Sequence, residues 1–176
     1  FKPIKENLDT TISPNVRSIT YNLFNLLGTM MTDDYQNDIK HLTKEDKSIL
    51  SRLGIRIGVK FFFMPNLLKK SAMELNAVLW KVFNKTSIKD LYPLPKDGRV
   101  SFTPNISMPT TYWFSIGYIC IDNFAVRVDV FERIFFLARQ KTKFGPFLES
   151  SDLMNPIGCN SSQLSSILSF CGFDYF

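Results

Sequence analysis

Residues 52–84 read RLGIRIGVKFFFMPNLLKKSAMELNAVLWKVFN, and the rest of the chain is organised around this stretch. From Ile55 to Phe63, apolar residues alternate with Arg56, Gly58 and Lys60. Alternation of this kind is the period of a half-buried β-strand, because successive side chains of a strand point to opposite faces. The pattern therefore predicts one strand with an apolar face and a cationic face.

A largely apolar helix is expected after this strand. Ser71 is its expected N-cap, and Glu74 completes an S-x-x-E capping box. The apolar side chains then fall on nearly all sides of the helix, at Met73, Leu75, Val78, Leu79, Val82 and Phe83. Because such a helix must be covered by protein on most sides, we expect it to form the centre of the core.

The composition indicates a folded protein. Of the 176 residues, 45% are hydrophobic and 14% are aromatic, which is ample for a packed core. No apolar run approaches the roughly 18 residues of a membrane span, and the start, FKPIKENLD, lacks the apolar core of a signal peptide. We therefore expect a cytoplasmic protein without a membrane partner. Because the chain begins with Phe1 rather than Met, we also expect it to be part of a longer protein.

The positive charge is concentrated in one segment. The formal net charge is +5, and Arg52 to Arg99 hold ten basic residues against three acidic ones, while the remainder holds eleven against thirteen. A concentrated cationic surface indicates nucleic acid or an acidic partner protein. The alternative is that a lysine- and asparagine-rich composition merely decorates a solvated surface.

The residue types do not favour catalysis. His41 is the single histidine, and we expect it in a surface loop. Cys120, Cys159 and Cys171 are odd in number and widely spaced, which predicts buried free thiols rather than disulfides or a zinc site. The chain contains no phosphate-binding glycine loop and no evident pair of carboxylates. We predict that this chain by itself is not an enzyme and holds no metal or cofactor.

Helices are expected before the central stretch. Ser13-Pro14 is a helix-start signal, and the apolar spacing that follows predicts an amphipathic helix from Asn15 to Met31. Thr32 to Lys40 is polar and is expected to form a loop or a weak helical turn. A capping box at Thr43 to Asp46 predicts a further short helix that Gly54 ends.

A proline-rich segment follows the central stretch. The prolines at positions 93, 95, 104 and 109 predict a surface spacer, because long structureless connections are unusual inside a compact domain. We therefore expect a helical and strand core subdomain with a basic face at 1–90, a spacer at 91–108, and a second subdomain at 109–176.

The second half has the elements of a winged-helix domain. A short aromatic helix precedes two strands, and Asp122-Asn123 between the strands predicts a tight hairpin turn. Asp129 is the expected cap of the next helix, and an ion pair with Asp129 or Glu132 is the expected role of Arg127. The fold class predicted for the whole chain is mainly α with small β-hairpins (α+β), namely a helical core plus a winged-helix-like C-terminal subdomain.

The tail is expected to form a helix, a turn and a second helix. Asn160 or Ser161 is the expected cap of the second helix, and Phe173 to Phe176 are expected to form a short closing strand. The second helix presents several serines and no lysine or arginine, so it is a poor reader of the major groove. A structural or protein-docking role is favoured for it.

Three stretches resemble the C-terminal accessory region of bacterial superfamily-two helicases related to the mitochondrial degradosome RNA helicase. LSRLGIRIGVKFFFMPNLLKKSAMELNAVLW (50–80) resembles that region's L-x-x-L-G-V-R-x-G … F-x-P-x-L-L-K-P … L-W pattern. GYICIDNFAVRVDVFERI (117–134) is similar to its G-F … A-V-R-V-D-x-L-E-R-L pattern, and MNPIGCNSSQLSSILSFCGF (154–173) to its closing segment. Lys70 departs from the pattern, which usually has proline there.

The resemblance implies an accessory module of an ATP-driven RNA helicase. The helicase motor, with its ATP and Mg²⁺ sites, would lie upstream of Phe1, and this chain has no positions for the motor's ATP or Mg²⁺ residues. The upstream motor domains are therefore an expected partner. Whether the substrate is RNA or DNA stays open.

Two functions fit these observations. In the first, a basic face contacts single-stranded RNA or DNA without reading its sequence. The residues expected on this face are Arg52, Arg56, Lys60, Lys69, Lys70 and Lys81. Phe62 would stack a base if it were exposed, although burial in the core is favoured. In the second function, the module is a scaffold that braces the motor or docks a partner protein, through the serine-lined last helix and the apolar helix at 71–84.

Overall fold

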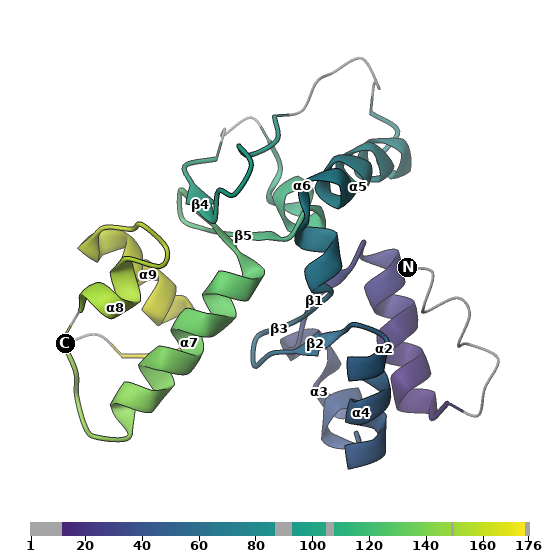
Figure 1. Cartoon of the computed structure of the whole chain (residues 1–176), viewed down its shortest axis with the longest axis horizontal. Coiled ribbons are helices and arrows are strands. Elements are labelled where there is room, and N and C mark those ends of the chain that lie inside the picture. Colours follow the sequence, from purple (N-terminus) through teal and green to yellow (C-terminus); the bar gives the residue numbers. More distant parts are fainter. Residues whose placement is uncertain (1–11, 87–92, 105–107, 149, 175–176) are drawn as a thin grey trace. The chain divides into compact units, whose positions relative to one another are not determined.

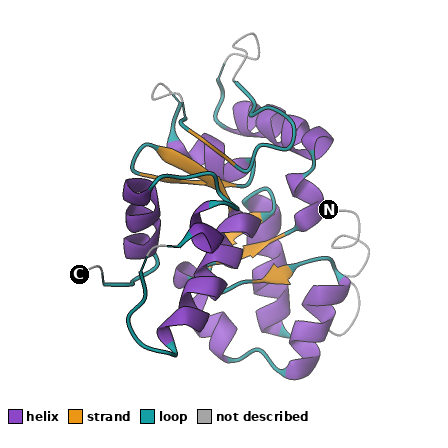
Figure 2. Cartoon of the chain, turned by 60° about the vertical axis from the view of Figure 1, so that its left-hand side comes forward, coloured by secondary structure: helices purple, strands orange, loops and turns teal. Residues whose placement is uncertain are grey.

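The structure is a computed structural model that describes residues 12–86, 93–104, 108–148 and 150–174. It combines helices with two small antiparallel sheets, so the predicted α+β class is confirmed (Figures 1 and 2). The chain divides into two compact units. Unit 1 comprises Phe1–Asp90 and Ser115–Gly117, and unit 2 comprises Leu91–Phe114 and Tyr118–Phe176.

Unit 1 places helices beside a three-stranded sheet of strand order β1-β3-β2. Its elements are α2 (Pro14–Asn25), β1 (Thr29–Met31), η1 (Asp33–Tyr35), α3 (Gln36–Lys40), α4 (Lys44–Arg52), β2 (Arg56–Ile57), β3 (Phe61–Phe63), η2 (Pro65–Leu68) and α5 (Lys70–Phe83). The helix α2 packs beside α3 and α4 (Figure 1). The core gathers side chains from α2, β1, α4 and β3, among them Ile19, Leu23, Met30, Leu50 and Phe62.

The single strand predicted from Ile55 to Phe63 is wrong, because the segment folds back into a hairpin. Arg56 pairs with Phe63 and Ile57 with Phe62, and the turn is closed by the Gly58 N–H, which donates to the Phe61 carbonyl at 2.9 Å. Period-two alternation is the same in one long strand and in two short strands joined by a tight turn. The central strand β3 is buried along its whole length, which explains its run of three phenylalanines.

The predicted helix from Asn15 to Met31 is too long. The helix α2 ends at Asn25, and the chain reverses through Leu27 and Gly28, which have φ angles of 59° and 94°. The Gly28 N–H donates to the Leu23 carbonyl at 2.8 Å, as in a helix terminated by a left-handed residue. A Cβ at Gly28 would lie 2.2 Å from Leu67 Cδ1, so a side chain here would clash as well as strain the backbone.

Two helix starts of unit 1 are joined by one buried carboxylate. Ser13 caps α2, as predicted, and its hydroxyl also donates to Asp46 Oδ1 at 2.7 Å. Asp46 completes the predicted capping box of α4, because Asp46 Oδ2 accepts the Thr43 N–H at 2.9 Å. The Thr43 N–H and the Ser13 hydroxyl hold the pKa of Asp46 below its usual value. This contact fixes α2 against α4 at their N-terminal ends.

Unit 2 contains a second antiparallel sheet, of strand order β4-β6-β5, followed by helices. Its elements are β4 (Ser101–Phe102), α6 (Thr110–Ser115), β5 (Tyr118–Ile121), β6 (Phe124–Arg127), α7 (Val128–Thr142), α8 (Ser151–Met154) and α9 (Ser161–Phe170). The division between the units falls within the last turn of α6. The segment expected to be a spacer at 91–108 contributes β4, which pairs with β6, and Ser101 Oγ donates to the Ile157 carbonyl.

Local signals in unit 2 have mixed outcomes. The turn at Asp122-Asn123 joins β5 to β6 as predicted, with Asp122 at a φ angle of 51°. Asn160 forms a capping box with Gln163 at the start of α9, which is the first of the two predicted caps. Asp129 does not cap α7; it accepts from Arg127 Nε at 2.7 Å and from Arg127 Nη2 at 3.0 Å.

The ends and the thiols complete the comparison with expectation. Of the predicted closing strand, Phe173 and Asp174 lie outside any strand, and the last two residues are outside the described part of the chain. The three cysteines are free, but only Cys171 is fully buried. Burial raises the pKa of Cys120 to about 11, which keeps this thiol protonated and unreactive. Within the described residues, no helix has the length and apolar character needed to cross a bilayer.

We expect the Asp46 contact to make stability fall in acid. Because the folded-state pKa lies below the unfolded value of about 3.9, the carboxylate stabilises the fold above about pH 4 and loses that effect as the pH drops through the folded pKa. Asp46→Asn keeps the shape and removes the charge. Urea unfolding at pH 7 and pH 3 should show a loss of about 1 kcal/mol at pH 7 for the variant, and a smaller difference from wild type at pH 3. A difference that stays constant with pH contradicts this role.

Candidate functional site

The helix α5 carries an exposed apolar stripe. Leu75, Val78, Leu79, Val82 and Phe83 are between 38% and 85% exposed, and Phe83 is the most exposed of them. Their spacing of i, i+3, i+4, i+7 and i+8 places all five on one face of the helix. We call these five residues the α5 stripe. The stripe extends over more than two turns and contains no polar residue.

The opposite face of α5 is buried in unit 1. Met73, Ala77 and Trp80 are buried there, and so is Asn76, which is only 2% exposed. The Asn76 Nδ2 group donates to the Leu27 carbonyl at 2.9 Å and to the Ser115 carbonyl at 3.2 Å. These acceptors belong to the reversal after α2 and to the segment Ser115–Gly117, which also packs in unit 1. Both amide hydrogens of Asn76 are therefore used.

The expectation that this helix forms the centre of the core is wrong. Apolar residues on nearly all sides gave no indication of which face turns inward. Burial of an amide is tolerated when hydrogen bonds replace its water, and Asn76 finds two acceptors on one side only. The α5 stripe is the feature that sequence reasoning missed, and the position of the lone Asn76 within the apolar run is the signal that locates it.

The start of α5 also differs from expectation. The helix begins at Lys70, with Lys69 at the N-cap position, and no capping bond from a side chain is found among the described residues there. Ser71 and Glu74 are exposed within the first turns, so they do not form the predicted capping box. Two lysines thus stand at the positive end of the helix dipole, where cations are unfavourable.

The predicted basic face is dispersed by the fold. Arg52 is exposed at the end of α4, and Arg56 is exposed in β2 at the open end of the hairpin. Lys60 lies in the turn at the other end of the same hairpin, so these two side chains do not share one strand face. Lys69 and Lys70 are exposed at the start of α5.

Two side chains expected at the basic face are buried instead. Lys81 is 7% exposed and Phe62 is fully buried in the core of unit 1. Lys81 falls on the edge of α5 next to Ala77, away from the α5 stripe. A buried lysine does not border a phosphate track, so the expectation for Lys81 is wrong, while the favoured burial of Phe62 is confirmed.

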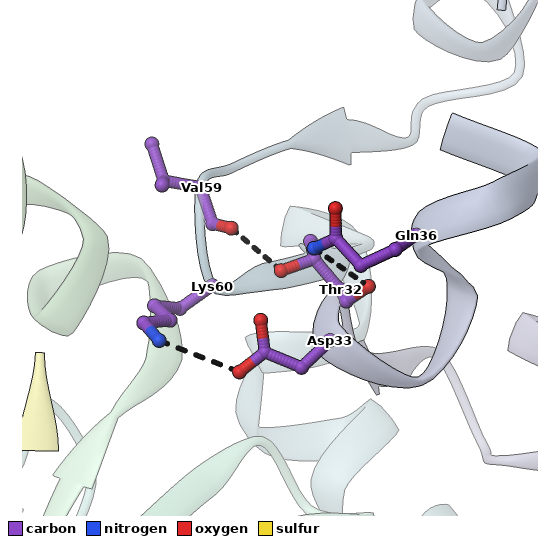
Figure 3. Close-up of polar contacts among 5 residues, drawn as sticks. All are labelled: Thr32, Asp33, Gln36, Val59 and Lys60. Atoms are coloured by element: carbon purple, nitrogen blue, oxygen red, sulfur yellow. Dashed lines mark hydrogen bonds and ion pairs between the residues drawn. The ribbon is translucent and has the colours of Figure 1, made fainter. Parts of the chain in front are cut away.

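Lys60 takes part in a local polar arrangement (Figure 3). Its Nζ atom lies 3.3 Å from Asp33 Oδ2. Beside this ion pair, the Thr32 hydroxyl donates to the Val59 carbonyl at 2.6 Å, and Gln36 Nε2 donates to the Thr32 carbonyl at 3.3 Å. These contacts tie the hairpin turn to η1 and α3. Lys60 therefore has a structural role in joining the hairpin to the helices.

Other candidates for chemistry have structural partners. The Arg127 guanidinium forms the predicted ion pair with Asp129, and this hydrogen-bonded contact raises the pKa of Arg127. His41 is exposed, and its Nδ1 atom lies 2.7 Å from the Asn37 carbonyl. Within the described residues, no three His, Cys, Asp or Glu side chains gather into a group that could hold a metal ion. The α5 stripe is the largest unexplained surface feature.

We expect Asn76 to be the main polar anchor of α5. Asn76→Ala removes the donor of two carbonyl groups, and the free energy of unfolding should fall by about 1–3 kcal/mol in urea titrations. Asn84→Ala is the matched control, since exposed Asn84 donates only within its own helix, to the Trp80 carbonyl at 2.8 Å. The control should change stability by about 0.5 kcal/mol or less. Equal effects of the two substitutions would contradict the anchoring role.

Comparisons with models of known protein families, with curated proteins and with solved structures find no match to this chain. The likeness to the helicase accessory region therefore rests on the three quoted stretches of sequence. What the chain does must be inferred from its surface, and above all from the α5 stripe and the cations at the two ends of that helix.

Proposed function

We propose that this chain is a non-catalytic accessory module of an ATP-dependent RNA helicase and that it docks onto another protein through α5. The single observation that carries the docking function is the α5 stripe. The helicase context is supported by the sequence resemblance alone. The free thiols and the positive charge support the cytoplasm as its compartment.

The size and shape of the α5 stripe support docking. Single exposed apolar residues are common, but contiguous apolar patches of a few hundred Å² mark interaction sites. The α5 stripe joins five large side chains on one helix face, and an exposed aromatic residue such as Phe83 is a typical anchor of an interface. A motor domain or a separate partner protein would cover this face.

Unit 2 fits the same proposal. We propose that its hairpin and its helices α7, α8 and α9 form a winged-helix-like subdomain. The helix α9 presents serines and contains no lysine or arginine, so a structural or docking role suits it better than a role in the major groove. Its mean contribution to binding nucleic acid would be small.

A second candidate function is a sequence-independent contact with single-stranded RNA or DNA. The observation that favours it is the exposure of four of the predicted cations, namely Arg52, Arg56, Lys69 and Lys70. The buried Phe62 and Lys81 remove the proposed stacking platform and one proposed phosphate contact. Such binding would therefore rest on phosphate charge alone.

The docking function predicts that the folded chain binds an apolar dye. Anilinonaphthalene sulfonate should fluoresce with the native protein, and Leu75→Gln with Val82→Gln should remove at least half of the signal. Glutamine retains helix propensity, so circular dichroism and the urea midpoint should change little. Phe136→Gln is the control, because Phe136 is as exposed as Val82, at 57%, but lies in α7. Absence of dye binding, or an equal loss in the control, argues against an open apolar face on α5.

The second candidate predicts salt-dependent binding. Fluorescence anisotropy with unrelated single-stranded RNA and DNA sequences should give affinities that fall with salt by a slope of about −0.7 per neutralised phosphate. Arg52→Glu with Arg56→Glu should weaken binding and reduce the slope, whereas Lys44→Glu with Lys47→Glu, which are exposed on α4, should have a smaller effect. No binding at low salt eliminates this function and leaves protein docking.

A further inference from the structure

We infer that the partner of α5 is an amphipathic helix whose apolar stripe is flanked by aspartate or glutamate side chains. This inference rests on the docking function proposed above and names the chemistry of its partner. It is carried by the shape of the α5 stripe and by the charges at the two ends of α5.

The shape of the α5 stripe fits another helix. Leu75, Leu79 and Phe83 form one ridge at i+4 spacing, and Val78 and Val82 form a second ridge beside it. Two parallel ridges leave a groove between them, and a row of side chains on a second helix fills such a groove. Helix-in-groove recognition of this kind uses apolar anchors at i, i+3, i+4 and i+7. An extended strand lacks this spacing.

The charges around the α5 stripe call for an acidic partner. Lys69 and Lys70 are exposed before it and Lys85 is exposed after it, and Glu74 is the single acidic residue from 69 to 85. The positive end of the helix dipole adds to the field of the first two lysines. Carboxylates on the partner, placed outside its apolar stripe, would pair with these cations at the rim of the interface, where complementary charge sets specificity and association rate.

The same charges disfavour a second copy of this chain. If two α5 helices packed in parallel, Lys69 and Lys70 would face their equivalents. If they packed antiparallel, these lysines would face Lys85 of the other copy. Like charges meet in both arrangements, and like-charge juxtaposition at an interface is costly. Self-association is therefore an outcome of the test rather than the expectation.

An anionic bilayer is also a poorer match. Helices that lie on membranes carry lysine and arginine along their polar face, on either side of the inserted apolar face. In α5 the face opposite the stripe is buried in unit 1, and Glu74 lies at the exposed edge of the helix. The cations stand at the ends of the stripe rather than along it. This arrangement suits a partner of about the same length as α5.

The test uses the full chain and two synthetic helical peptides with the same leucine stripe. One peptide carries glutamates beside the stripe and the other carries lysines at the same positions. In fluorescence anisotropy at moderate salt, the glutamate peptide should bind at least tenfold more tightly than the lysine peptide. Lys69→Glu with Lys70→Glu should reverse or abolish this preference. Acidic residues suit a helix N-terminus, so this variant should stay folded, which circular dichroism checks.

Control variants separate the two levels of the proposal. Lys44→Glu with Lys47→Glu changes the net charge equally on α4 and should keep the preference for the glutamate peptide. Leu75→Gln with Val82→Gln should weaken both peptides. If both peptides bind equally and the stripe substitutions weaken both, the acidic partner is wrong but docking through α5 stands.

The remaining outcomes overturn more. If the stripe substitutions leave peptide binding unchanged, docking through α5 is itself wrong. If neither peptide binds, the acidic helix is wrong, and the occupant is then identified by two further measurements on the same chain. Concentration-dependent sedimentation that the stripe substitutions abolish would identify a second copy, and binding to vesicles of phosphatidylserine and phosphatidylcholine would identify a membrane surface.

Discussion

The two hydrogen bonds donated by Asn76 are the constraint on which the arrangement of unit 1 depends. The helix α5 is apolar on nearly all sides, so the hydrophobic effect alone does not select which face turns inward. The side-chain amide does, because an amide buried without partners loses about 1–3 kcal/mol, and the Leu27 and Ser115 carbonyls satisfy it on one side only. Once that side is buried, the α5 stripe must face outward.

The acceptors of Asn76 depend in turn on two chain reversals. Leu27 and Gly28 have positive φ angles at the end of α2, and Gly117 has a φ angle of 88° two residues after Ser115. A Cβ at Gly117 would lie 2.2 Å from Leu68 Cδ2, so the glycine allows this segment to approach the residues that precede α5. Three segments that are distant in sequence thus meet at one amide, and together they position the surface proposed to dock.

Features encoded within four residues were predicted from the sequence. Ser13, the Thr43 capping box, Asn160 and the turn at Asp122-Asn123 were all found where local chemistry placed them. Features that depend on distant contacts were not. The end of α2 depends on close packing of Gly28 against Leu67, and the hairpin in the central stretch depends on pairing of β3 with both β1 and β2. Periodicity carries no information on either contact.

The candidate site shows the same division. The sequence located the excess of positive charge between Arg52 and Arg99, but not its distribution, because the hairpin separates Arg56 from Lys60 and burial removes Lys81. It also indicated a helix of unusual apolar content, and read that content as core. The outward face depends on Asn76, whose acceptors lie 49 and 39 residues away along the chain.

The orientation of α5 is tested most directly by hydroxyl-radical footprinting of the unmodified chain with mass spectrometry. Met73 and Trp80 are intrinsically more easily oxidised than phenylalanine, yet both are buried, whereas Phe83 in the same helix is 85% exposed. We expect Phe83 to be oxidised readily, and Met73 and Trp80 to be protected until the chain is unfolded in urea. Rapid oxidation of Met73 and Trp80 in the native chain, with Phe83 protected, would show that the apolar stripe faces inward and would contradict docking through α5.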